Sequence, residues 1–230
     1  MLKTVRNIFR KLRRDVVSPV QWDNLRRLQP MSTKFGFDRG TPVDRHYIAA
    51  FLEAHRADIH GHVLEIAESS YSKQFGSQVT SFEVLHVQPG ANVTIVGDLT
   101  NTASLPANQI DCFICTQTFN FIYDFKTAIA GAWHLLKPGG VLLATLGGAT
   151  QVSAYDAARW GDYWRFTTQS AEKVFGEIFG KDNVEVTAYG NVLTCTAILQ
   201  GLAAEELTRE ELDYQDPVYP IIIAVRARKA

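Results

Sequence analysis

The sequence predicts an α/β fold with a mainly parallel sheet and helices on both faces. From residue 61 onward, short apolar runs of strand length alternate with segments of helical periodicity, which is the pattern of parallel strands joined by crossover helices. The first apolar run, residues 63–66, ends in an abrupt change to small and polar residues. In an open α/β sheet, the turn after such a strand is where a ligand binds.

The strands and helices follow in order between residues 63 and 228. We expect strands at residues 63–66, 79–85, 93–96, 110–115, 141–146, 184–188 and 221–228, helices at residues 71–75, 125–136 and 168–179, and a helical insertion at residues 193–212. Gly76 ends the first of these helices. The proline and two glycines of residues 138–140 should end the helix of residues 125–136 and reverse the chain into the fifth strand.

The chain of 230 residues suits one α/β domain with additions at its amino-terminal side. We expect residues 1–60 to hold a basic amphipathic helix, a loop and a lid or cap helix, and residues 61–230 to form the main domain with a helical insertion at 191–213. The lid helix should begin with Thr41 as its N-cap, Pro42 at the first helical position and Asp44 in the first turn.

Composition and charge exclude several classes of protein. With 46% hydrophobic and 20% charged residues, no apolar run near the roughly 20 residues of a membrane span and no signal-peptide core, we expect a cytoplasmic protein. The net charge of −1 conceals +6 in residues 1–30, which leaves −7 for the remainder. The acidic remainder argues against nucleic-acid binding.

Residues 1–16 combine the basic charge with apolar residues at helical spacing. Such a helix suits peripheral contact with an anionic membrane surface, contact with a protein partner, or packing on its own domain or on the second subunit of a homodimer. The apolar positions that define this helix are Leu2, Val5, Phe9, Leu12 and Val16.

Two of the three cysteines, Cys112 and Cys115, form a CxxC pattern inside the expected fourth strand. Residues three apart on a strand point to opposite faces, so these two thiols should not converge on a metal ion. We expect them to be buried packing residues. No spacing of His, Asp and Glu elsewhere in the sequence suggests a metal site.

Several motifs between residues 61 and 146 resemble the core of class I S-adenosylmethionine-dependent methyltransferases. The strand with its acid (residues 63–66), the acidic turn (97–99), the fourth strand (110–114) and above all the Leu-Lys-Pro-Gly-Gly stretch (136–140) match that family's motifs. The Asp-Tyr-Trp-Arg-Phe-Thr segment at 162–167 is similar to one found in bacterial members associated with glycan or natural-product gene clusters. The resemblance implies a Rossmann-like, doubly wound sheet of seven strands, of which the last is antiparallel.

The chain departs from this family in the turn after its first strand. Where the family has three glycines, this sequence places Ala67, Ser69 and Tyr71. Glycines there let the backbone approach the cofactor and take conformations closed to other residues. We expect the turn to be rebuilt by the short helix that ends at Gly76. A protein of this fold that has lost catalysis and serves as a partner-binding module is the alternative.

The resemblance also implies which residues hold S-adenosyl-L-methionine and its product S-adenosyl-L-homocysteine. Glu65 and the turn through Ala67 and Ser69 would face the methionine portion. An acid near the end of the second strand would accept hydrogen bonds from both ribose hydroxyls, and Glu83 is the candidate, with His86 nearby.

The same resemblance places Asp98 at the adenine amine and Leu99 against the adenine ring. Thr116 and Gln117, after the fourth strand, would approach the sulfonium and its methyl group. Glu83 and Asp98 are equally open to interpretation as ordinary surface carboxylates, and Gln117 as a structural residue.

The expected reaction is methyl transfer to a small-molecule or glycan acceptor, with a hydroxyl oxygen as the methylated atom. Its catalytic residues would come from the segment after the fifth strand: Asp162 to bind or deprotonate the hydroxyl, Tyr163 as part of an aromatic wall, and Arg165 to hold an anionic group. The alternative has Asp162 and Arg165 as a mutual ion pair and the flanking Trp160 and Trp164 as caps on the core.

Overall fold

The computed structural model describes residues 21–230, and the chain divides into two compact units, Met1–Pro30 and Met31–Ala230. Within the described part of the first unit there is one short 3-10 helix, Asp23–Leu25. The basic amphipathic helix expected at residues 1–16 lies outside the described residues. Its contact with a membrane, a partner or a second subunit therefore stays a prediction.

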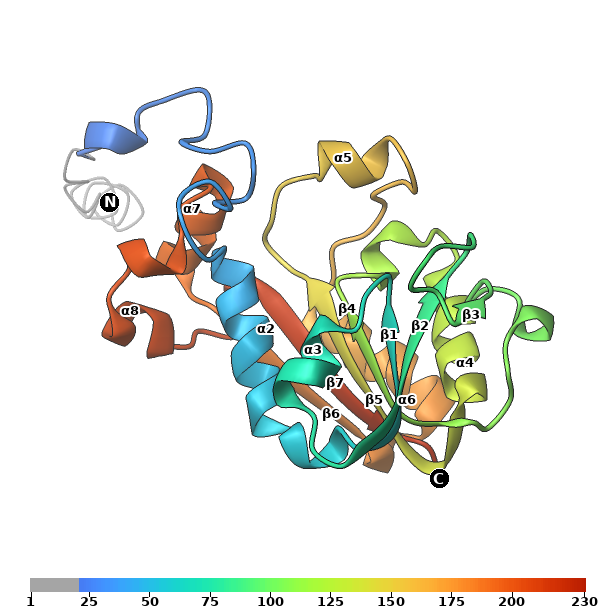
Figure 1. The fold of residues 1–230 in the computed structure, drawn as a ribbon. Coiled ribbons are helices and arrows are strands. Elements are labelled where there is room, and N and C mark those ends of the chain that lie inside the picture. Colours follow the sequence, from blue (N-terminus) through green and yellow to red (C-terminus); the bar gives the residue numbers. More distant parts are fainter. Residues whose placement is uncertain (1–20) are drawn as a thin grey trace, which may run out of the picture. The chain divides into compact units, whose positions relative to one another are not determined.

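The second unit is built on one sheet of seven strands in the order β3-β2-β1-β4-β5-β7-β6 (Figure 1). The five strands from β3 to β5 pair in parallel, whereas β7 runs antiparallel to both β5 and β6. This confirms the expected fold class, including the antiparallel last strand. The strands are β1 (Gly61–Ile66), β2 (Val79–His86), β3 (Ile95–Val96), β4 (Ile110–Thr116), β5 (Leu136–Gly147), β6 (Val184–Tyr189) and β7 (Ile222–Arg228).

Helices cover both faces of this sheet. In Figure 1, α2 and α3 lie in front of the sheet and α6 lies behind it. Apolar residues of α2, α3 and α7 pack with one face of the sheet in a first core cluster, and those of α4 and α6 pack with the other face in a second. The helices are α2 (Val43–Ala54), α3 (Ser70–Phe75), α4 (Phe125–Leu135), α5 (Ala154–Ala157), α6 (Thr168–Phe179), α7 (Val192–Gln200) and α8 (Arg209–Asp213).

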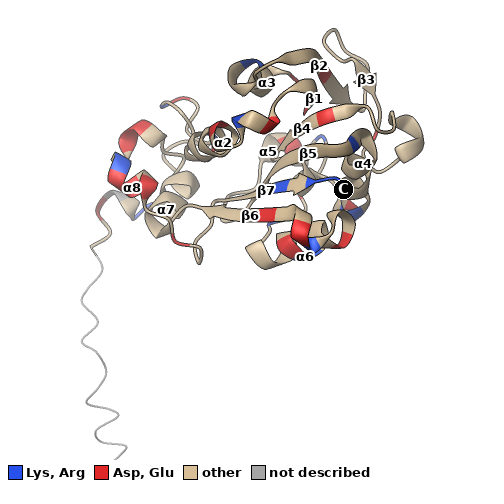
Figure 2. Cartoon of the chain, turned by 90° about the horizontal axis from the view of Figure 1, so that it is seen from below, with Lys and Arg blue, Asp and Glu red and all other residues tan. Residues whose placement is uncertain are grey.

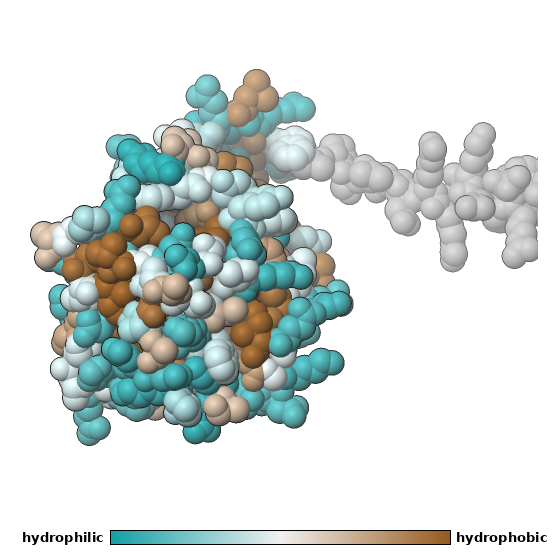
Figure 3. Space-filling model, turned by 90° about the vertical axis from the view of Figure 1, so that its right-hand side faces the viewer, coloured by the Kyte–Doolittle hydropathy of each residue, from teal (hydrophilic) through white to brown (hydrophobic). Residues whose placement is uncertain are grey.

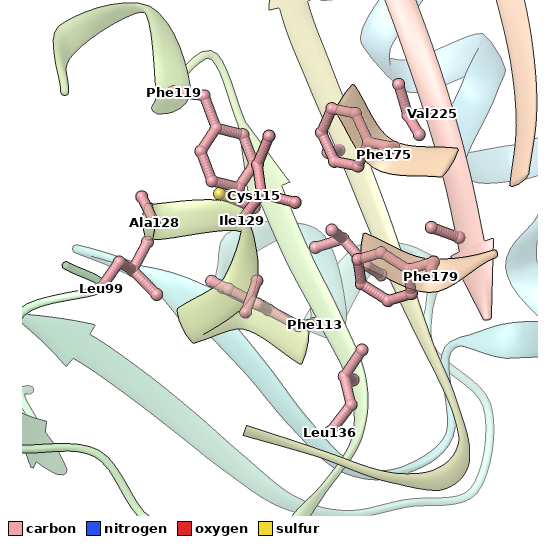
Figure 4. Packing of buried hydrophobic residues seen from close by; sticks show 14 of the residues in the cluster. Leu99, Phe113, Cys115, Phe119, Ala128, Ile129, Leu136, Phe175, Phe179 and Val225 are labelled. Atoms are coloured by element: carbon pink, nitrogen blue, oxygen red, sulfur yellow. The ribbon is translucent and has the colours of Figure 1, made fainter. Parts of the chain in front are cut away.

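The core between α6 and the sheet shows how sequence period determines packing. Phe175 and Phe179 are four residues apart and therefore lie on the same side of α6, where both are almost completely buried. Figure 4 shows their rings directed toward the sheet, near Val225 of β7. A capping box of Thr167 and Ser170 begins this helix, and its bounds agree with those expected from the sequence.

The helical insertion expected at residues 193–212 is made of several short elements. It consists of α7, a 3-10 turn at Ala204–Glu206 and α8. The helix ends at Gly201, which has a left-handed φ of 68° and lies so close to Ser32 that an added Cβ would be 2.2 Å from its carbonyl oxygen. A left-handed glycine is a common helix end, and here it also lets residues 31–32 hydrogen bond to the carbonyl of Gln200.

The start of α2 differs from expectation. Pro42, with ψ of 141°, is the N-cap, so Thr41 is one residue too early and no side chain caps the helix. Both backbone groups of Thr41 are used elsewhere: its carbonyl accepts from the amide of Ala204 at 2.7 Å, and its amide donates to the Glu205 carboxylate at 2.9 Å. Pairing with the insertion therefore determines where α2 begins.

Strand β5 begins five residues earlier than the sequence predicted. Leu136 pairs with Ile110, and the register then shifts so that Val141 pairs with Cys112. The extra residues, which include Gly139 with φ of 82°, form an irregularity within the strand. The Pro-Gly-Gly segment thus reverses the chain, as expected, but it does so inside the sheet.

The two cysteines of β4 face opposite sides of the sheet, as their spacing predicted. Cys112 belongs to the core cluster that includes α2, and Cys115 to the one that includes α4. Neither forms a disulfide, and both are buried. Burial raises the pKa of the Cys115 thiol to about 12, so these residues pack as neutral side chains.

Charged side chains fix the carboxyl end of α2 to the sheet. Arg226 of β7 donates from Nε and Nη2 to the two carboxylate oxygens of Asp58, at 2.8 and 3.0 Å, and from Nη1 to Glu185 of β6 at 3.0 Å. Figure 2, which views the molecule from below, shows the basic residues of β7 in blue. Because Asp58 lies in the turn after α2, this ion-pair network helps to set the position of that helix.

The molecular surface at the β3 edge is mixed in character. Figure 3 shows hydrophobic residues there in separate patches among hydrophilic ones. Phe82 of β2 and Val96 of β3 are among the exposed apolar residues of these edge strands. Among the described residues, no helix has both the length and the apolar character needed to cross a membrane.

Candidate functional site

A cavity of about 890 Å³ lies at the carboxyl ends of the parallel strands. Its walls come from the residues that follow β1, β2, β3, β4 and β5, from the start of α2, and from the loop before α2. The segment that carries α5 lies above these strand ends (Figure 1). The cavity therefore occupies the edge of the sheet where the sequence places a ligand, and its volume is within the range of pockets for small molecules, about 300–1,000 Å³.

The turn after β1 keeps a glycine-like backbone although it lacks the glycine. Ala67 has a φ of 67°, a left-handed conformation that glycine adopts freely and that other residues seldom adopt. Its amide donates to the carbonyl of Leu85 on β2 at 3.1 Å, which holds the turn in place. Ala67 lines the cavity as expected.

The rest of the turn is rebuilt by α3, which ends at Gly76 as predicted. Glu65 holds the start of this helix: its carboxylate accepts from the amides of Tyr71 and Ser72, at 3.1 and 2.7 Å, and from the Ser72 hydroxyl at 2.5 Å. Burial raises the pKa of Glu65 in spite of these hydrogen bonds, which lower it. Glu65 is buried at the cavity wall, and both of its oxygens are already bonded.

Tyr71, the least glycine-like of the three replacements, joins two walls of the cavity. Its hydroxyl accepts a hydrogen bond from Nη1 of Arg45 at 2.9 Å, and its ring lies 6.3 Å from that of Phe75. Burial raises the pKa of the Tyr71 phenol, so it stays neutral and bonds to Arg45 as an uncharged acceptor. The cavity keeps its volume beside this ring.

The acidic turn after β3 brings both of its predicted residues to the cavity. Asp98 accepts through Oδ1 from the amide and hydroxyl of Thr100, each at 2.8 Å, which fixes the direction of its carboxylate. Leu99 is 4% exposed and joins the core beneath the cavity. This part of the wall can offer a carboxylate oxygen and an apolar surface side by side.

The residues after β4 also line the cavity. Thr116 is the last residue of β4, and Gln117 follows with a left-handed φ of 48°. The Gln117 amide donates to the carbonyl of Thr145 on β5 at 2.9 Å, and its side-chain oxygen accepts from Asn120 at 2.8 Å. Strained backbone at the ends of both β1 and β4 is typical of functional sites.

Two predicted cofactor residues, Ser69 and Glu83, do not line the cavity. Strand β2 continues to His86, so Glu83 lies three residues before its end, where it pairs with Leu64 and accepts a hydrogen bond from Ser81. His86 takes the position at the strand end that we had expected an acid to hold. Ser69 is the N-cap of α3 and is not part of the cavity lining.

Asp162 and Arg165 line the cavity as an ion pair. Nη1 and Nη2 of Arg165 donate to the two carboxylate oxygens at 2.5 and 3.0 Å, and the Ser153 amide donates to Oδ2 at 2.9 Å. Burial favours the neutral acid, but the Arg165 and Ser153 hydrogen bonds outweigh it and lower the pKa of Asp162. Arg165 also donates to the carbonyls of Thr150 and Gln151, so the pair fastens the segment that carries α5.

The aromatic residues of this segment divide between cavity and core. Tyr163 is half exposed, and its ring lies 5.4 Å from that of Tyr123. Trp160 lies edge-to-face with His86 at 5.6 Å, and both line the cavity. Trp164 instead packs on the core and donates its indole N–H to the carbonyl of Tyr123 at 3.1 Å.

The sequence suggested a lid or cap helix at α2 but assigned none of its residues to the ligand. Asp44 and Arg45 line the cavity, as do Phe35 and Phe37 of the preceding loop. In the sequence, Asp44 is indistinguishable from an ordinary acid in the first turn of a helix, and only the fold shows that this helix begins at the cavity.

The cavity wall is acidic. Seven carboxylic side chains line it against two arginines, and one of those arginines is paired with Asp162. This arrangement favours a ligand that carries positive charge. Among residues 21–230, no group of three or more His, Cys, Asp or Glu side chains is placed to hold a metal ion.

Comparison with known proteins agrees with the geometry. Residues 45–144 match the family model of the methyltransferase domain. Comparison of the sequence with curated proteins finds no match.

Two solved structures illustrate the likeness of fold. The N-methyltransferase NodS from Bradyrhizobium japonicum WM9, in complex with S-adenosyl-L-homocysteine, superposes with a TM-score of 0.50 at 13% identity, over 87% of this chain and 94% of that one. An S-adenosylmethionine-dependent methyltransferase from Archaeoglobus fulgidus has a TM-score of 0.52 at 13% identity, over 80% of this chain and 94% of that one. The methyltransferase-domain match thus covers residues 45–144, and the strand order is that of the Rossmann-like class I methyltransferase fold.

Proposed function

We propose that the protein is an enzyme that transfers a methyl group from S-adenosyl-L-methionine to a small-molecule or glycan acceptor, with a hydroxyl oxygen as the methylated atom. The observation that carries this proposal is the cavity of about 890 Å³ at the carboxyl ends of β1 to β5, which holds Ala67, Asp98, Thr116 and Gln117 in one wall. These are four of the residues to which the family resemblance assigns the cofactor.

The residues present fit this cofactor. Asp98 can accept from the adenine amine while Leu99 packs on the ring, because the carboxylate and the apolar surface are adjacent in one turn. The left-handed Ala67 leaves room for close approach of the methionine portion. The acidic character of the wall suits the positive charge on the sulfonium. S-adenosylmethionine, when bound, supplies an electrophilic methyl group.

Two of the expected roles change with the geometry. The Glu65 carboxylate is committed to α3, so it supports the cofactor turn and does not itself reach the ligand. At the end of β2, His86 replaces Glu83 as the side chain available to the ribose. A ring nitrogen of His86 lies 3.0 Å from the amide of Gln88, which orients the ring.

The segment after β5 offers the acceptor aromatic rings to stack on, and an ion pair holds this segment in place. Tyr163 and Trp160 present half-exposed rings on which a sugar or planar acceptor can stack. The pair of Asp162 and Arg165 fixes this segment over the cavity. A fixed cover excludes water and keeps the acceptor aligned with the methyl group, and both effects lower the barrier to displacement.

Isothermal titration with S-adenosylhomocysteine tests the proposal. We expect binding to the wild type, and Asp98→Asn should weaken it by about tenfold, as is typical for loss of one hydrogen bond to a carboxylate. Glu83→Gln is the matched control, because Glu83 lies outside the cavity, and it should bind as the wild type does. Absence of binding to the wild type at millimolar ligand would leave the partner-binding module as the better interpretation.

A further inference from the structure

We infer that Arg45, in the first turn of α2, binds the α-carboxylate of the methionine portion of S-adenosyl-L-methionine, and that Tyr71 holds its guanidinium in place. The inference rests on the proposed function and deepens it. The family resemblance assigns the methionine portion to a turn with three glycines, which this chain lacks. Arg45 and Tyr71 supply a side-chain contact where the glycine turn is missing.

The first argument is the state of the two arginines that line the cavity. Arg165 donates to both carboxylate oxygens of Asp162 and to three backbone carbonyls, so each of its five N–H groups has an acceptor. The side chain of Arg45 makes one hydrogen bond, from Nη1 to the hydroxyl of Tyr71 at 2.9 Å. No carboxylate among residues 21–230 forms an ion pair with it. In the described cavity wall, Arg45 is therefore the arginine that can still bind an anion.

The second argument is which edge of the Arg45 guanidinium stays free. The N–H groups of Nε and Nη2 lie parallel on one edge, and this pair matches the two oxygens of a carboxylate. Neither atom has an acceptor among residues 21–230, because the bond to Tyr71 is made by Nη1. That bond restricts the rotation of the guanidinium, so less conformational entropy is lost when a carboxylate binds.

The third argument is the half-buried position of Arg45. A guanidinium that has lost part of its water is stable only with an anion or several acceptors in exchange. Burial lowers the pKa of Arg45, but the charge of Asp44 and the hydrogen bond to Tyr71 raise it by more, so the side chain stays charged. The Asp44 carboxylate accepts from the amide of Arg45 and not from its guanidinium. The free N–H groups thus still lack an acceptor, and a bound carboxylate would supply it.

The contact with Tyr71 also places Arg45 at the methionine end of the cavity. The amide of Tyr71 donates to the Glu65 carboxylate at 3.1 Å, which ties Tyr71 to β1. Ala67, between them in sequence, lines the same cavity. Figure 1 shows α3 and α2 on the same face of the sheet. Asp98, which the resemblance assigns to adenine, follows β3, two strands away from β1.

The acidic wall gives this inference a distinctive sign. Seven carboxylic side chains line the cavity, and by themselves they favour a ligand without a carboxylate over the same ligand with one. A preference for the ligand that has the carboxylate therefore requires a cation in contact with it. Removal of that cation should remove the preference.

Isothermal titration compares S-adenosylhomocysteine with its decarboxylated analogue, which keeps the adenosine, the sulfur and the amine. We expect the wild type to bind S-adenosylhomocysteine about 10- to 100-fold more tightly, as is typical of hydrogen bonds between charged groups. Arg45→Met should lose this preference. Arg45→Lys keeps the charge without the two parallel N–H groups and should keep a preference of about threefold. Tyr71→Phe should lower the preference in part, because the guanidinium is no longer held.

Arg56→Met is the matched control. Arg56 follows α2, is exposed where it pairs with Glu53, and is not part of the cavity lining, so the wild-type preference should remain. Equal binding of the two ligands by the wild type, a measurement that needs no variant to fold, would overturn the inference and leave the proposed function intact. A preference that persists in Arg45→Met would do the same. A wild type that does not bind S-adenosylhomocysteine would instead contradict the proposed function, and the inference would fall with it.

Discussion

Arg45 donates a hydrogen bond from Nη1 to the hydroxyl of Tyr71 at 2.9 Å, which connects the start of α2 to α3 across the cavity wall. The donor is charged and the contact is partly buried, so the bond should be stronger than one between neutral groups. It fastens the rebuilt turn to the covering helix in a way that a glycine at position 71 could not.

Tyr71→Phe should therefore lower the free energy of unfolding by about 1–2 kcal/mol, because it leaves the half-buried Arg45 without this acceptor. The free energy is measured by urea denaturation. Tyr214→Phe is the matched control: Tyr214 is 65% exposed, its hydroxyl bonds to no residue among 21–230, and its change should stay within about 0.5 kcal/mol. Equal effects of the two substitutions would contradict the importance of the Arg45 bond.

Ala67 stores backbone strain at the end of β1, since its φ is 67°. Ala67→Gly should relieve this strain. The relief should exceed the cost of glycine's greater flexibility in the unfolded chain, so the free energy of unfolding should rise by up to about 1 kcal/mol. Ala158→Gly is the control, because Ala158 has an ordinary helical φ of −73° and should lose about 0.5–1 kcal/mol. Urea denaturation of both variants gives the comparison, and a loss at both positions would argue against strain at Ala67.

Sequence pattern predicted the fold well because the relevant signals are local. The alternation of strand and helix, the helix of residues 168–179, and the opposite faces of Cys112 and Cys115 all follow from periodicities of two or 3.6 residues. The error at Thr41 has a different origin: contacts between the loop of residues 31–42 and the insertion, more than 150 residues apart in sequence, decide where α2 begins.

Topology also explains where several of the candidate cofactor residues lie. Ala67, Asp98, Thr116 and Gln117 are at or just past the carboxyl ends of parallel strands, so their place at this edge of the sheet follows from strand order, while their roles toward the cofactor stay predictions. Asp44 precedes the first strand, so strand order alone does not place it at the cavity, and the expected lid or cap helix did not identify which of its residues would line the site. Glu83 lies inside β2, three residues before His86 at the strand's end, and it does not line the cavity.

The ion pair of Asp162 and Arg165 should contribute strongly to stability because the Asp162 side chain is 1% exposed. Asp162→Asn leaves Arg165 without its charged partner, and the free energy of unfolding should fall by about 3 kcal/mol at neutral pH. Asp213→Asn removes the exposed pair with Arg209 and should cost less than about 0.5 kcal/mol. Urea denaturation of the two variants measures the contrast, and a similar cost for both would show that burial adds nothing here.

The contribution of Asp162 should depend on pH in one direction. Its pKa is lowered in the folded protein, so the unfolded chain binds a proton first as the pH falls, and stability is lost below the ordinary value of 3.8. The difference in stability between the wild type and Asp162→Asn should be constant at neutral pH and shrink as the pH passes below that value. A difference that grew toward acid pH would contradict the lowered pKa.

Gly201 ends α7 in a conformation and a space that only glycine fits. With φ of 68° and a Cβ position 2.2 Å from the carbonyl oxygen of Ser32, Gly201→Ala combines left-handed strain with a clash against backbone, and it should destabilise the protein by about 2–4 kcal/mol. Gly176→Ala is the matched control within α6: the nearest atom is a flexible Lys181 side-chain carbon at 3.3 Å, so the gain in helix propensity, about 1 kcal/mol at most, should dominate. Urea denaturation measures the change in the free energy of unfolding for both variants. Changes of opposite sign would support tight packing between the loop of residues 31–42 and the insertion. A Gly201→Ala variant as stable as the wild type would show that the backbone at Ser32 moves easily to admit the methyl group.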